Sequence, residues 1–500
     1  MPPSRPDHLL DRTRLPEPVL DANPELVSLY WTAWETAWTH VVEQPGVPRS
    51  PYMDEGFDPD VIWIWDTCLM THFCKYAPED FPGIESLQNF YGPLHDGAPS
   101  ALQIQHPDNP PLFAWAEEEY VRHTGDLEHV ARLLDAGYLQ RHFTWFDTVT
   151  PGTVLPVTVM PTTIERRPEG YRWGAIQSGM DNTPRAGEAN WYGNSRGGIL
   201  WLDAMAQQAL SALSIARLAR LVDRPALAEE YDAKHAALCA ELQHHWDDED
   251  ATFYDRLETE PFPFRRVVTP AAYWPLLAGA CSPEQAQALA DLLTDSQRLG
   301  GPVPWPSVAR DDPAFRADGQ YWRGGVWVPL AYMSARALAD HGHAVLARAA
   351  SKALLEHMAA TYAGCSPSTI WEAYAPVAAA PATDKDGTTT VRPQFCGWSA
   401  LGPISMLIEH VLGFRVDATT RTVHWDPDGG GRQGIRRLRC GPATIDAVAE
   451  NDEVVVEVDR PITLVLGGPP VDLGAGHHVL PRPGQGTSAT LPARPSAASL

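Results

Sequence analysis

The sequence lacks any run of about 18 consecutive apolar residues, the length that a membrane-spanning helix needs. Its first residues, MPPSRPDHLLDRTRLPEP, hold no apolar stretch of the kind found in a secretory signal. Basic residues are scarce, because 38 Lys and Arg stand against 63 Asp and Glu, for a formal net charge of −25. An acidic surface repels nucleic acid and anionic lipid. We therefore expect neither a nucleic-acid partner nor a membrane partner.

Cysteine is also scarce, with seven scattered residues and no Cys-x-x-Cys pair. This pattern argues against a disulfide framework and a cysteine-based zinc site, and it favours a cytoplasmic protein with reduced thiols. The segment 395–402 has no Gly-x-Ser-x-Gly motif, because Ala and Leu follow Ser399. The chain has no P-loop, no dinucleotide-binding fingerprint of strand, glycine loop and helix, and no His-Glu-x-x-His motif. The segment 384–387 (DKDG) has a fragment of calcium-loop chemistry without the remaining ligands, so we interpret it as a surface turn. The sequence thus predicts no cofactor and no metal.

From about residue 25 to 412 the sequence predicts one helix after another. In the segment 25–44, for example, Leu26, Tyr30 and Trp34 recur at the spacing of one helix face. Further helices are expected at 61–77, 127–147, 198–220, 224–245, 283–296, 323–341, 343–361 and 397–412. No fixed repeat of roughly 33–45 residues is present, which argues against a solenoid. Long loops rich in Trp, Asp, Gly and Pro favour a closed ring of helices with its site at one mouth.

After Gly413 the composition changes to short alternating or β-branched runs, separated by Asp, Gly and Pro. Such runs are typical of a small β-sandwich. The last residues are rich in Pro, Ser, Ala and Gly, a composition typical of disorder. We predict an N-terminal arm (1–24), a helical catalytic domain (25–412), a β-sandwich (413–481) and a disordered tail (482–500).

Tryptophan is abundant, with 18 residues, and many lie beside acidic residues, Arg or Gly instead of in apolar runs. Core packing explains part of this number, and stacking of rings on sugar faces would explain the rest. Five segments combine aromatic residues with polar, catalytic types: 63–67 (WIWDT), 177–185 (QSGMDNTPR), 320–327 (QYWRGGVW), 370–376 (IWEAYAP) and 395–402 (FCGWSALG).

Three carboxylates stand out within these segments. Asp66 lies in an apolar helix, where it must be paired or must face a polar cavity, and the sequence leaves both readings open. Asp181 lies in a loop, where it could close an Asx-turn or point into a cavity mouth. Glu372 is framed by two aromatic residues. Hydrolysis of a glycosidic bond needs an acid for the departing oxygen and a second carboxylate for water or for direct attack. Asp181 and Glu372 fit these two parts, provided that the fold brings them together.

In this order, the five segments resemble the motifs of glycoside hydrolase family 63 and its bacterial relatives. That group includes mannosylglycerate hydrolases, glucosylglycerate hydrolases and the processing α-glucosidase I. The resemblance runs from about residue 57 to 412. It implies an (α/α)6 barrel, which is a ring of paired helices, and hydrolysis of a short α-glucoside or α-mannoside with inversion of the anomeric carbon.

The resemblance also implies roles for individual residues. By position in the motifs, Asp181 is the general acid and Glu372 is the general base. Their carboxylates should be about 6.5–9.5 Å apart, which leaves room for a water molecule. The remaining matched or neighbouring residues are implied to contact the sugar: Trp63, Trp65, Asp66, Gln105, Gly179, Asn182, Tyr321, Trp322, Arg323, Trp327, Trp371 and Trp398.

Two features depart from this group. Its glycerate-specific members use an Arg and a Tyr from a mobile loop after the acid, for which the candidates here are Arg185, Trp191, Tyr192 and Arg196. The C-terminal β-segment is similar to the terminal sandwiches of longer α-glycosidases and of α-L-rhamnosidases.

Other functions remain open on the same helical ring. An α-L-rhamnosidase or a trehalase-like hydrolase would act on a different sugar. A non-catalytic carbohydrate-binding protein belongs to another class, and it would tolerate loss of either carboxylate. In every case the partner is a small carbohydrate. The sequence leaves the oligomeric state undetermined, a homo-oligomer included.

Overall fold

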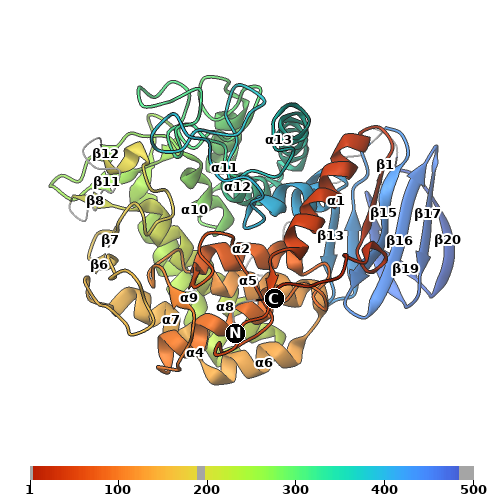
Figure 1. The fold of residues 1–500 in the computed structure, drawn as a ribbon, viewed down its shortest axis with the longest axis horizontal. Coiled ribbons are helices and arrows are strands. Elements are labelled where there is room, and N and C mark those ends of the chain that lie inside the picture. Colours follow the sequence, from red (N-terminus) through yellow and green to blue (C-terminus); the bar gives the residue numbers. More distant parts are fainter. Residues whose placement is uncertain (1–3, 188–197, 429, 484–500) are drawn as a thin grey trace.

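The computed structural model describes residues 4–187, 198–428 and 430–483. Helices form the larger body of the molecule, and two β-sheets stand at one side of it (Figure 1). The first helix, α1 (Pro24–Trp38), lies between the two parts. The prediction of a mainly helical protein with a smaller β-part is confirmed at this level.

The other helices of the described chain have the following bounds: α2 (Ile64–Cys74), α3 (Gly83–Ser86), α4 (Gln88–His95), α5 (Phe113–Thr124), α6 (Leu127–Ala136), α7 (Tyr138–Thr148), α8 (Leu202–Leu221), α9 (Pro225–Leu242), α10 (Trp274–Leu277), α11 (Pro283–Thr294), α12 (Val328–Asp340), α13 (Ala344–Gly364), the short 3-10 turn η5 (Ser399–Leu401) and the π-helix η6 (Gly402–Val411).

The inner helices contact one another in a closed order. α2 contacts α5, α5 contacts α8, and α8 contacts α10. α10 contacts α12, α12 contacts η6, and η6 contacts α2 again. α2 is buried along its whole length, and α12 is buried at every residue except Asp340. α9 and α13 keep exposed residues and pack on α8 and α12, the helices that precede them. α9 and α13 thus lie on two members of this contact series and leave part of their own surface exposed.

Glycine explains two differences between predicted and observed helices. The helix predicted at 127–147 is divided into α6 and α7 at Gly137, whose φ of +71° is left-handed. The helix predicted at 323–341 begins only at Val328, because Gly324 has a φ of +149°, a conformation that a helix cannot contain. Residues 323–327 are thereby left free to line a site instead of a helix.

Two further differences have other causes. The segment predicted as a regular helix at 397–412 forms η5 and then the π-helix η6, with Pro403 as its second residue. No helix is predicted at 113–124, because Glu117, Glu118 and Glu119 interrupt the apolar pattern. α5 nevertheless forms there, and all three glutamates are buried. Their burial is made possible by ion pairs and hydrogen bonds.

The β-part consists of a five-stranded and a four-stranded sheet. The first has the order β1 (Glu17–Leu20), β15 (Gln433–Cys440), β16 (Ala443–Glu450), β17 (Glu453–Val458) and β20 (Gly476–Pro481), with all neighbours antiparallel. The second has the order β13 (Phe414–Asp417), β14 (Thr422–Trp425), β18 (Ile462–Leu466) and β19 (Val471–Leu473), with β14 and β18 parallel. In β16 and β17 buried and exposed residues alternate, as the sequence pattern indicates.

The remaining strands are short and pair as follows: β2 (Val41–Val42) with β3 (Tyr52–Met53), β4 (Val61–Ile62) with β5 (Gln103–Ile104), β6 (Glu165–Arg167) with β7 (Gly170–Arg172), β9 (Trp246–Asp247) with β10 (Thr252–Phe253), and β11 (Asp255–Leu257) with both β8 (Ile199–Leu200) and β12 (Phe264–Arg265).

The N-terminal arm takes part in the five-stranded sheet. In its strand β1, Glu17 pairs with Arg436 and Leu20 pairs with Gln433. The guanidinium of Arg437 also lies 3.0 Å from the carboxylate of Glu17. The start of the chain is thereby joined to its last third, and Figure 1 shows β1 running beside β15. Most of the predicted tail, residues 484–500, lies outside the described residues.

A buried cluster of four charges joins the inner helices at one end of α2. Lys75, which follows α2, lies 3.2 Å from Glu119 of α5 and 3.0 Å from Glu409 of η6. Arg336 of α12 contacts the same two carboxylates at 3.0 and 2.6 Å. Each side chain is at most 5% exposed. Lys75 lies nine residues after Asp66, or roughly 13 Å along the helix. The cluster therefore joins α5, α12 and η6 at the end of α2 opposite to Asp66.

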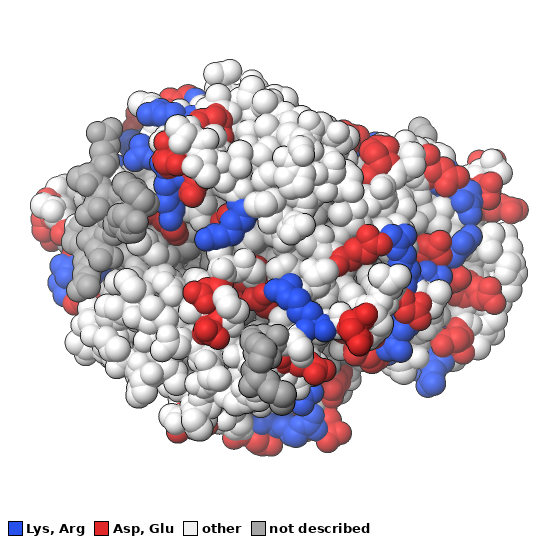
Figure 2. Space-filling view, in the orientation of Figure 1, with Lys and Arg blue, Asp and Glu red and all other residues white. Residues whose placement is uncertain are grey.

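Surface charges of both signs are interspersed on the face in Figure 2, most clearly over the β-sheets. No extended patch of one sign is visible there, in spite of the net charge of −25. Over the described residues, no helix combines the length and the apolar character needed to cross a membrane.

Candidate active site

The loop of Asp181 packs directly on the first tryptophan motif. Gly179 adopts a φ of +85°, and a Cβ atom at this position would lie 2.4 Å from the indole ring of Trp65. A side chain is thus excluded by space as well as by backbone conformation. Gly179 and Trp65, both predicted as site residues, are in contact for this reason.

The same loop is bonded to the segment 320–327. The Nδ2 atom of Asn182 donates to the carbonyl of Gln320 at 2.9 Å, and its Oδ1 atom accepts from the backbone N–H of Trp322 at 2.8 Å. Gln320 and Tyr321 both have positive φ, at +32° and +65°. Such conformations persist in non-glycine residues only where neighbouring groups hold them, and they cluster at functional sites. Asn182 is one of the groups that hold this turn.

Arg185 does not face a leaving group, contrary to one of our expectations. Its guanidinium contacts Asp203 of α8 at 2.8 Å and Asp255 of β11 at 2.6 Å, and its side chain is 2% exposed. The guanidinium also lies over the ring of Trp201, 4.6 Å from its centroid. Arg185 therefore fixes the end of the Asp181 loop to the helical body. The other candidates for this role, Trp191, Tyr192 and Arg196, lie outside the described residues.

Glu372 is buried and lies between a tyrosine and an arginine. The hydroxyl of Tyr321 donates to Oε1 at 2.9 Å, and the backbone N–H of Arg392 donates to Oε2 at 3.2 Å. The Arg392 guanidinium lies 3.6 Å from Oε1. Burial raises the pKa of Glu372, whereas Arg392 and Tyr321 lower it. These partners favour the ionised form, which a general base requires.

Asp181 is paired with a lysine that the sequence did not single out. The Nζ atom of Lys385 lies 2.6 Å from Oδ2 of Asp181, and the two side chains are 24% and 19% exposed. The same ammonium lies 4.6 Å from the ring centroid of Tyr321. Burial raises the pKa of Asp181, and Lys385 counters this rise. Contacts thus lead from Asp181 through Lys385 and Tyr321 to Glu372.

Asp66 lies in the first turn of α2 and is fully buried. Neither carboxylate oxygen has a hydrogen-bond partner among the described residues. Burial raises the pKa of Asp66 strongly, and the nearby carboxylates of Glu55, Glu372 and Asp181 raise it further. A buried carboxyl group without partners is costly, and it is expected where a ligand supplies the missing hydrogen bonds. The lack of a described hydrogen-bond partner favours the reading in which Asp66 faces a polar cavity.

Glu55 is a buried carboxylate that the sequence did not reveal. Its Oε1 atom accepts from the backbone N–H of Trp63 at 3.1 Å and from the Thr67 hydroxyl at 2.5 Å. It thereby satisfies donors at the start of α2. Burial raises the pKa of Glu55 to about 8, and the charge of Asp54 contributes to the rise. Glu55 lies in no recognisable motif, so only the folded structure could find it.

Aromatic rings from three of the five segments, 63–67, 320–327 and 395–402, form one cluster. Trp322 stacks on Trp327 with 3.9 Å between centroids, and Trp398 lies 5.2 Å from Trp65 and 5.7 Å from Trp327. Phe57, which the sequence did not single out, connects Trp63 to this cluster. Its ring centroid lies 4.8 Å from that of Trp63 and 5.9 Å from that of Trp398. In the described part of the chain, the buried indole N–H groups of Trp322 and Trp371 have no hydrogen-bond acceptor. They are therefore free to donate to a ligand.

Two predicted site residues are placed less directly. The parallel pairing of β4 and β5 brings Gln105 beside Trp63, and its backbone N–H donates to Ile62 at 2.9 Å. Arg323 is half-buried, and its side chain forms no hydrogen bond or ion pair with any described residue. Its backbone carbonyl accepts from Arg316 at 2.7 Å. Arg323 does not orient a carboxylate in this structure, because no described carboxylate contacts it.

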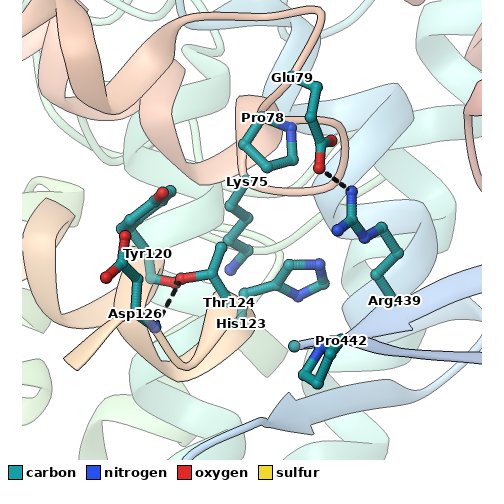
Figure 3. A pocket seen from close by; sticks show the side chains of 10 residues that line it. Lys75, Pro78, Glu79, Tyr120, His123, Thr124, Asp126, Arg439 and Pro442 are labelled. Atoms are coloured by element: carbon teal, nitrogen blue, oxygen red, sulfur yellow. Dashed lines mark hydrogen bonds and ion pairs between the residues drawn. The ribbon is translucent and has the colours of Figure 1, made fainter. Parts of the chain in front are cut away.

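A separate cavity of about 310 Å³ lies at the other end of α2, between the helical body and the β-part (Figure 3). Lys75 and Arg439 line it, but Lys75 belongs to the buried charge cluster and Arg439 pairs with Glu79. None of the five motif segments contributes to the cavity lining. Its charges are balanced within the protein, and it is not the place where Asp181 and Glu372 act.

The arrangement fits acid–base chemistry on a polar, ring-shaped substrate. Two partly or fully buried carboxylates have different partners: Asp181 pairs with the Lys385 ammonium, and Glu372 accepts from the Tyr321 hydroxyl beside the Arg392 guanidinium. Indole rings offer faces for sugar stacking, and Asp66 offers acceptors for hydroxyl groups. Within the described residues, no three His, Cys, Asp or Glu side chains gather in a way that could hold a metal ion.

The chain matches one protein-family model. Residues 96–389, more than half of the chain, match the mannosylglycerate hydrolase MGH1-like glycoside hydrolase domain. The mannosylglycerate hydrolase of Thermus thermophilus is 35% identical over 122 residues, which cover 23% of this chain and 28% of that protein. A probable mannosyl-oligosaccharide glucosidase of Schizosaccharomyces pombe is 24% identical over 353 residues, covering 59% of this chain and 42% of that protein. The chain thus spans less than half the length of the yeast relative.

Other similarities cover more of the chain. An uncharacterised protein of Borreliella burgdorferi is 21% identical over 417 residues, covering 80% of this chain and 81% of that protein. The crystal structure of the family 63 mannosylglycerate hydrolase of Thermus thermophilus with Tris and D-glycerate aligns with a TM-score of 0.53, at 18% identity, over 76% of this chain and all of that one. A family 78 rhamnosidase of a Bacillus species aligns with a TM-score of 0.56, at 14% identity, over 88% of this chain and 41% of that one. At these identities the two structures show a shared fold.

Proposed function

Since this chain belongs to the mannosylglycerate hydrolase-like glycoside hydrolases, we propose that it hydrolyses a short α-glucoside or α-mannoside with Asp181 as general acid and Glu372 as general base. One observation carries this assignment. Asp181 and Glu372, far apart in the sequence, are linked by contacts through Lys385 and Tyr321. Such convergence of two carboxylates is what glycoside hydrolysis needs.

The proposed mechanism is a single displacement. Asp181 gives its proton to the glycosidic oxygen while the bond between that oxygen and the anomeric carbon breaks. Glu372 takes a proton from a water molecule whose oxygen attacks the opposite face of the sugar. The products are the inverted sugar and the free alcohol, after which solvent returns a proton to Asp181 and removes one from Glu372. Tyr321 and Arg392 support the ionised state of Glu372 before the reaction.

The sugar binds, in this proposal, between Asp66 and the tryptophan cluster. The partnerless oxygens of Asp66 would accept hydrogen bonds from sugar hydroxyl groups. The indole N–H groups of Trp322 and Trp371 would donate to others. We further propose that the closed order of inner helices, with α9 and α13 outside, forms an (α/α)6 barrel whose mouth holds the sugar.

The assignment is tested with a panel of α-glucosides and α-mannosides, which includes disaccharides and glycosylglycerates. Proton NMR follows the anomer that is released, for the wild type and for the Asp181→Asn and Glu372→Gln variants. We expect the inverted anomer from the wild type and a loss of at least about 10³-fold in both variants, because each removes one half of the acid–base pair. The Glu128→Gln variant, which changes an exposed side chain of α6, is the control.

Other results would point elsewhere. Release of the anomer with retained configuration would make Glu372 a nucleophile and would contradict the single displacement. Because a rhamnosidase shares the fold, α-L-rhamnosides belong in the panel, and turnover of these alone would make the protein a rhamnosidase. Activity that survives both substitutions would remove Asp181 and Glu372 from the mechanism.

A further inference from the structure

Lys385 is held firmly at the site by the turn that carries it. The backbone N–H groups of Thr388 and Thr389 both donate to Oδ1 of Asp386 at 2.8 Å, which closes the turn on itself. At the base of the turn, the backbone N–H of Tyr321 donates to the carbonyl of Thr383 at 2.8 Å. The turn is therefore anchored to the residue whose ring faces the Lys385 ammonium.

The position of Lys385 conflicts with the part assigned to Asp181. A general acid must carry a proton when the substrate is bound. An ammonium 2.6 Å from a carboxylate oxygen stabilises the ionised form instead. Among the described residues, Asp384, Asp66 and Tyr321 also lie near Asp181, and none of these three supplies a positive charge. Asp181 therefore becomes an effective acid only if the ammonium finds another anion.

The substrate can supply that anion, because of where Lys385 lies. Asp181 must contact the glycosidic oxygen, so any group attached to that oxygen on the leaving side comes within reach of the lysine. A hydroxyl group cannot replace a carboxylate as counter-ion of an ammonium, because it carries no negative charge to attract the cation away from Asp181. A carboxylate on the leaving group can.

On the basis of the proposed function, we propose that Lys385 couples the binding of an anionic leaving group to protonation of Asp181. The carboxylate of the leaving group takes over the Lys385 ammonium, and Asp181 then takes one proton from solvent. Lys385 is thus a positioning residue that selects substrates through the state of the acid. Substrates with an uncharged leaving group leave the ion pair intact and find Asp181 ionised.

The first experiment measures proton uptake without turnover. D-glycerate, used as a leaving-group probe, is titrated into the wild type by calorimetry at pH 7 in two buffers of different ionisation enthalpy. We expect binding with the uptake of up to one proton for each glycerate bound. Lys385→Met should weaken binding about tenfold to hundredfold and abolish uptake. Lys385→Arg keeps the charge and should retain uptake, and Lys352→Met, at an exposed pair on α13, should behave as the wild type.

The second experiment compares a glycosylglycerate with the matching glycosylglycerol, which lacks the carboxylate. In Lys385→Met, kcat/KM for the anionic substrate should fall about tenfold or more. For the neutral substrate it should rise, and the basic limb of its pH profile should move to higher pH, because Asp181 holds its proton better without the ammonium. A purely structural role of Lys385 would lower both values.

Each outcome decides the proposal. Glycerate binding without proton uptake, or equal binding to Lys385→Met and the wild type, overturns it, as does an unchanged preference between the two substrates. Melting temperatures of all variants show whether they are folded. If Lys385→Met does not fold, the proton uptake of Lys385→Arg tests the proposal in its place. If the wild type hydrolyses none of the glycosides, the proposed function fails, while the calorimetry still judges the coupling.

Discussion

The side chain of Asn182 accepts a hydrogen bond from the backbone N–H of Trp322, 2.8 Å away, and donates one to the carbonyl of Gln320. It stands next to Asp181 in sequence, and Tyr321 lies between its two partners. The side-chain amide of Asn182 therefore fixes the loop of Asp181 relative to Tyr321, which contacts Glu372. The separation of the two carboxylates depends on this bridge.

We predict that Asn182→Ala lowers kcat/KM about tenfold to hundredfold, because it removes the partners of one buried and one partly buried backbone group and releases the turn. The control is Asn89→Ala, since Asn89 also bridges a backbone N–H and a carbonyl, those of Arg49, outside the site. Steady-state kinetics and thermal melts of both variants test this. Equal activity loss in the two variants would show that Asn182 acts only through stability.

Gly179→Ala should destabilise the loop of Asp181 and remove most activity. Its Cβ would lie 2.4 Å from the Trp65 ring, at a φ of +85° that costs about 1–3 kcal/mol for other residues. Gly187→Ala is the matched control, because its φ is +91° but nothing lies within 4 Å of the added Cβ. Activity and tryptophan fluorescence of the two variants separate backbone strain from the clash. Wild-type activity in Gly179→Ala would contradict the packing described here.

Tyr321→Phe should move the acidic limb of the pH–activity profile upward. The Tyr321 hydroxyl lowers the pKa of Glu372 by hydrogen bonding to its ionised form, so removal raises that pKa. A base with a higher pKa becomes active only at higher pH. The expected shift is about one pH unit, the size of a typical hydrogen bond to a charged group. Tyr52→Phe, which loses a hydrogen bond to Gln44 in another part of the core, should leave the profile unchanged.

Glu55→Gln should gain stability relative to the wild type as the pH rises. Burial raises the pKa of Glu55 to about 8, against about 4.3 in an unfolded chain. The native state therefore binds this proton more tightly, and the associated stability is lost between about pH 4.3 and 8. Glutamine keeps the acceptor for Trp63 and Thr67 but never ionises. Urea unfolding at pH 5 and pH 8.5 measures the difference, and a constant difference would exclude a raised pKa.

The sequence predicted helices well where apolar spacing alone decides them. The segments predicted at 198–220 and 224–245 appear as α8 and α9 with boundaries shifted by a few residues. It failed at α5, because the burial of Glu117, Glu118 and Glu119 depends on partners in other helices. Strands β15, β16 and β17 were predicted from their alternation, whereas β1 has no such pattern and forms through pairing with β15.

For the site, residue types near aromatic motifs were predictable and their partners were not. The segment 384–387 is a turn, as its Asp and Gly residues indicate. Yet nothing local to this turn shows that Lys385 reaches Asp181, because that contact arises only when two distant loops meet. Arg185 misled for the same reason, since its two aspartate partners come from distant parts of the chain.

The pairing of β1 with β15 has a consequence for how the protein is made. During synthesis the arm leaves the ribosome before the helical body, and its partner strand emerges only after that body. The five-stranded sheet is therefore completed after translation of nearly all described residues, through a contact of very long sequence separation, which makes this step slow. Until then β15 presents an open edge, the kind of surface on which chains aggregate. Removal of residues 1–20 should thus reduce the yield of soluble protein more than it reduces the activity of the molecules that fold.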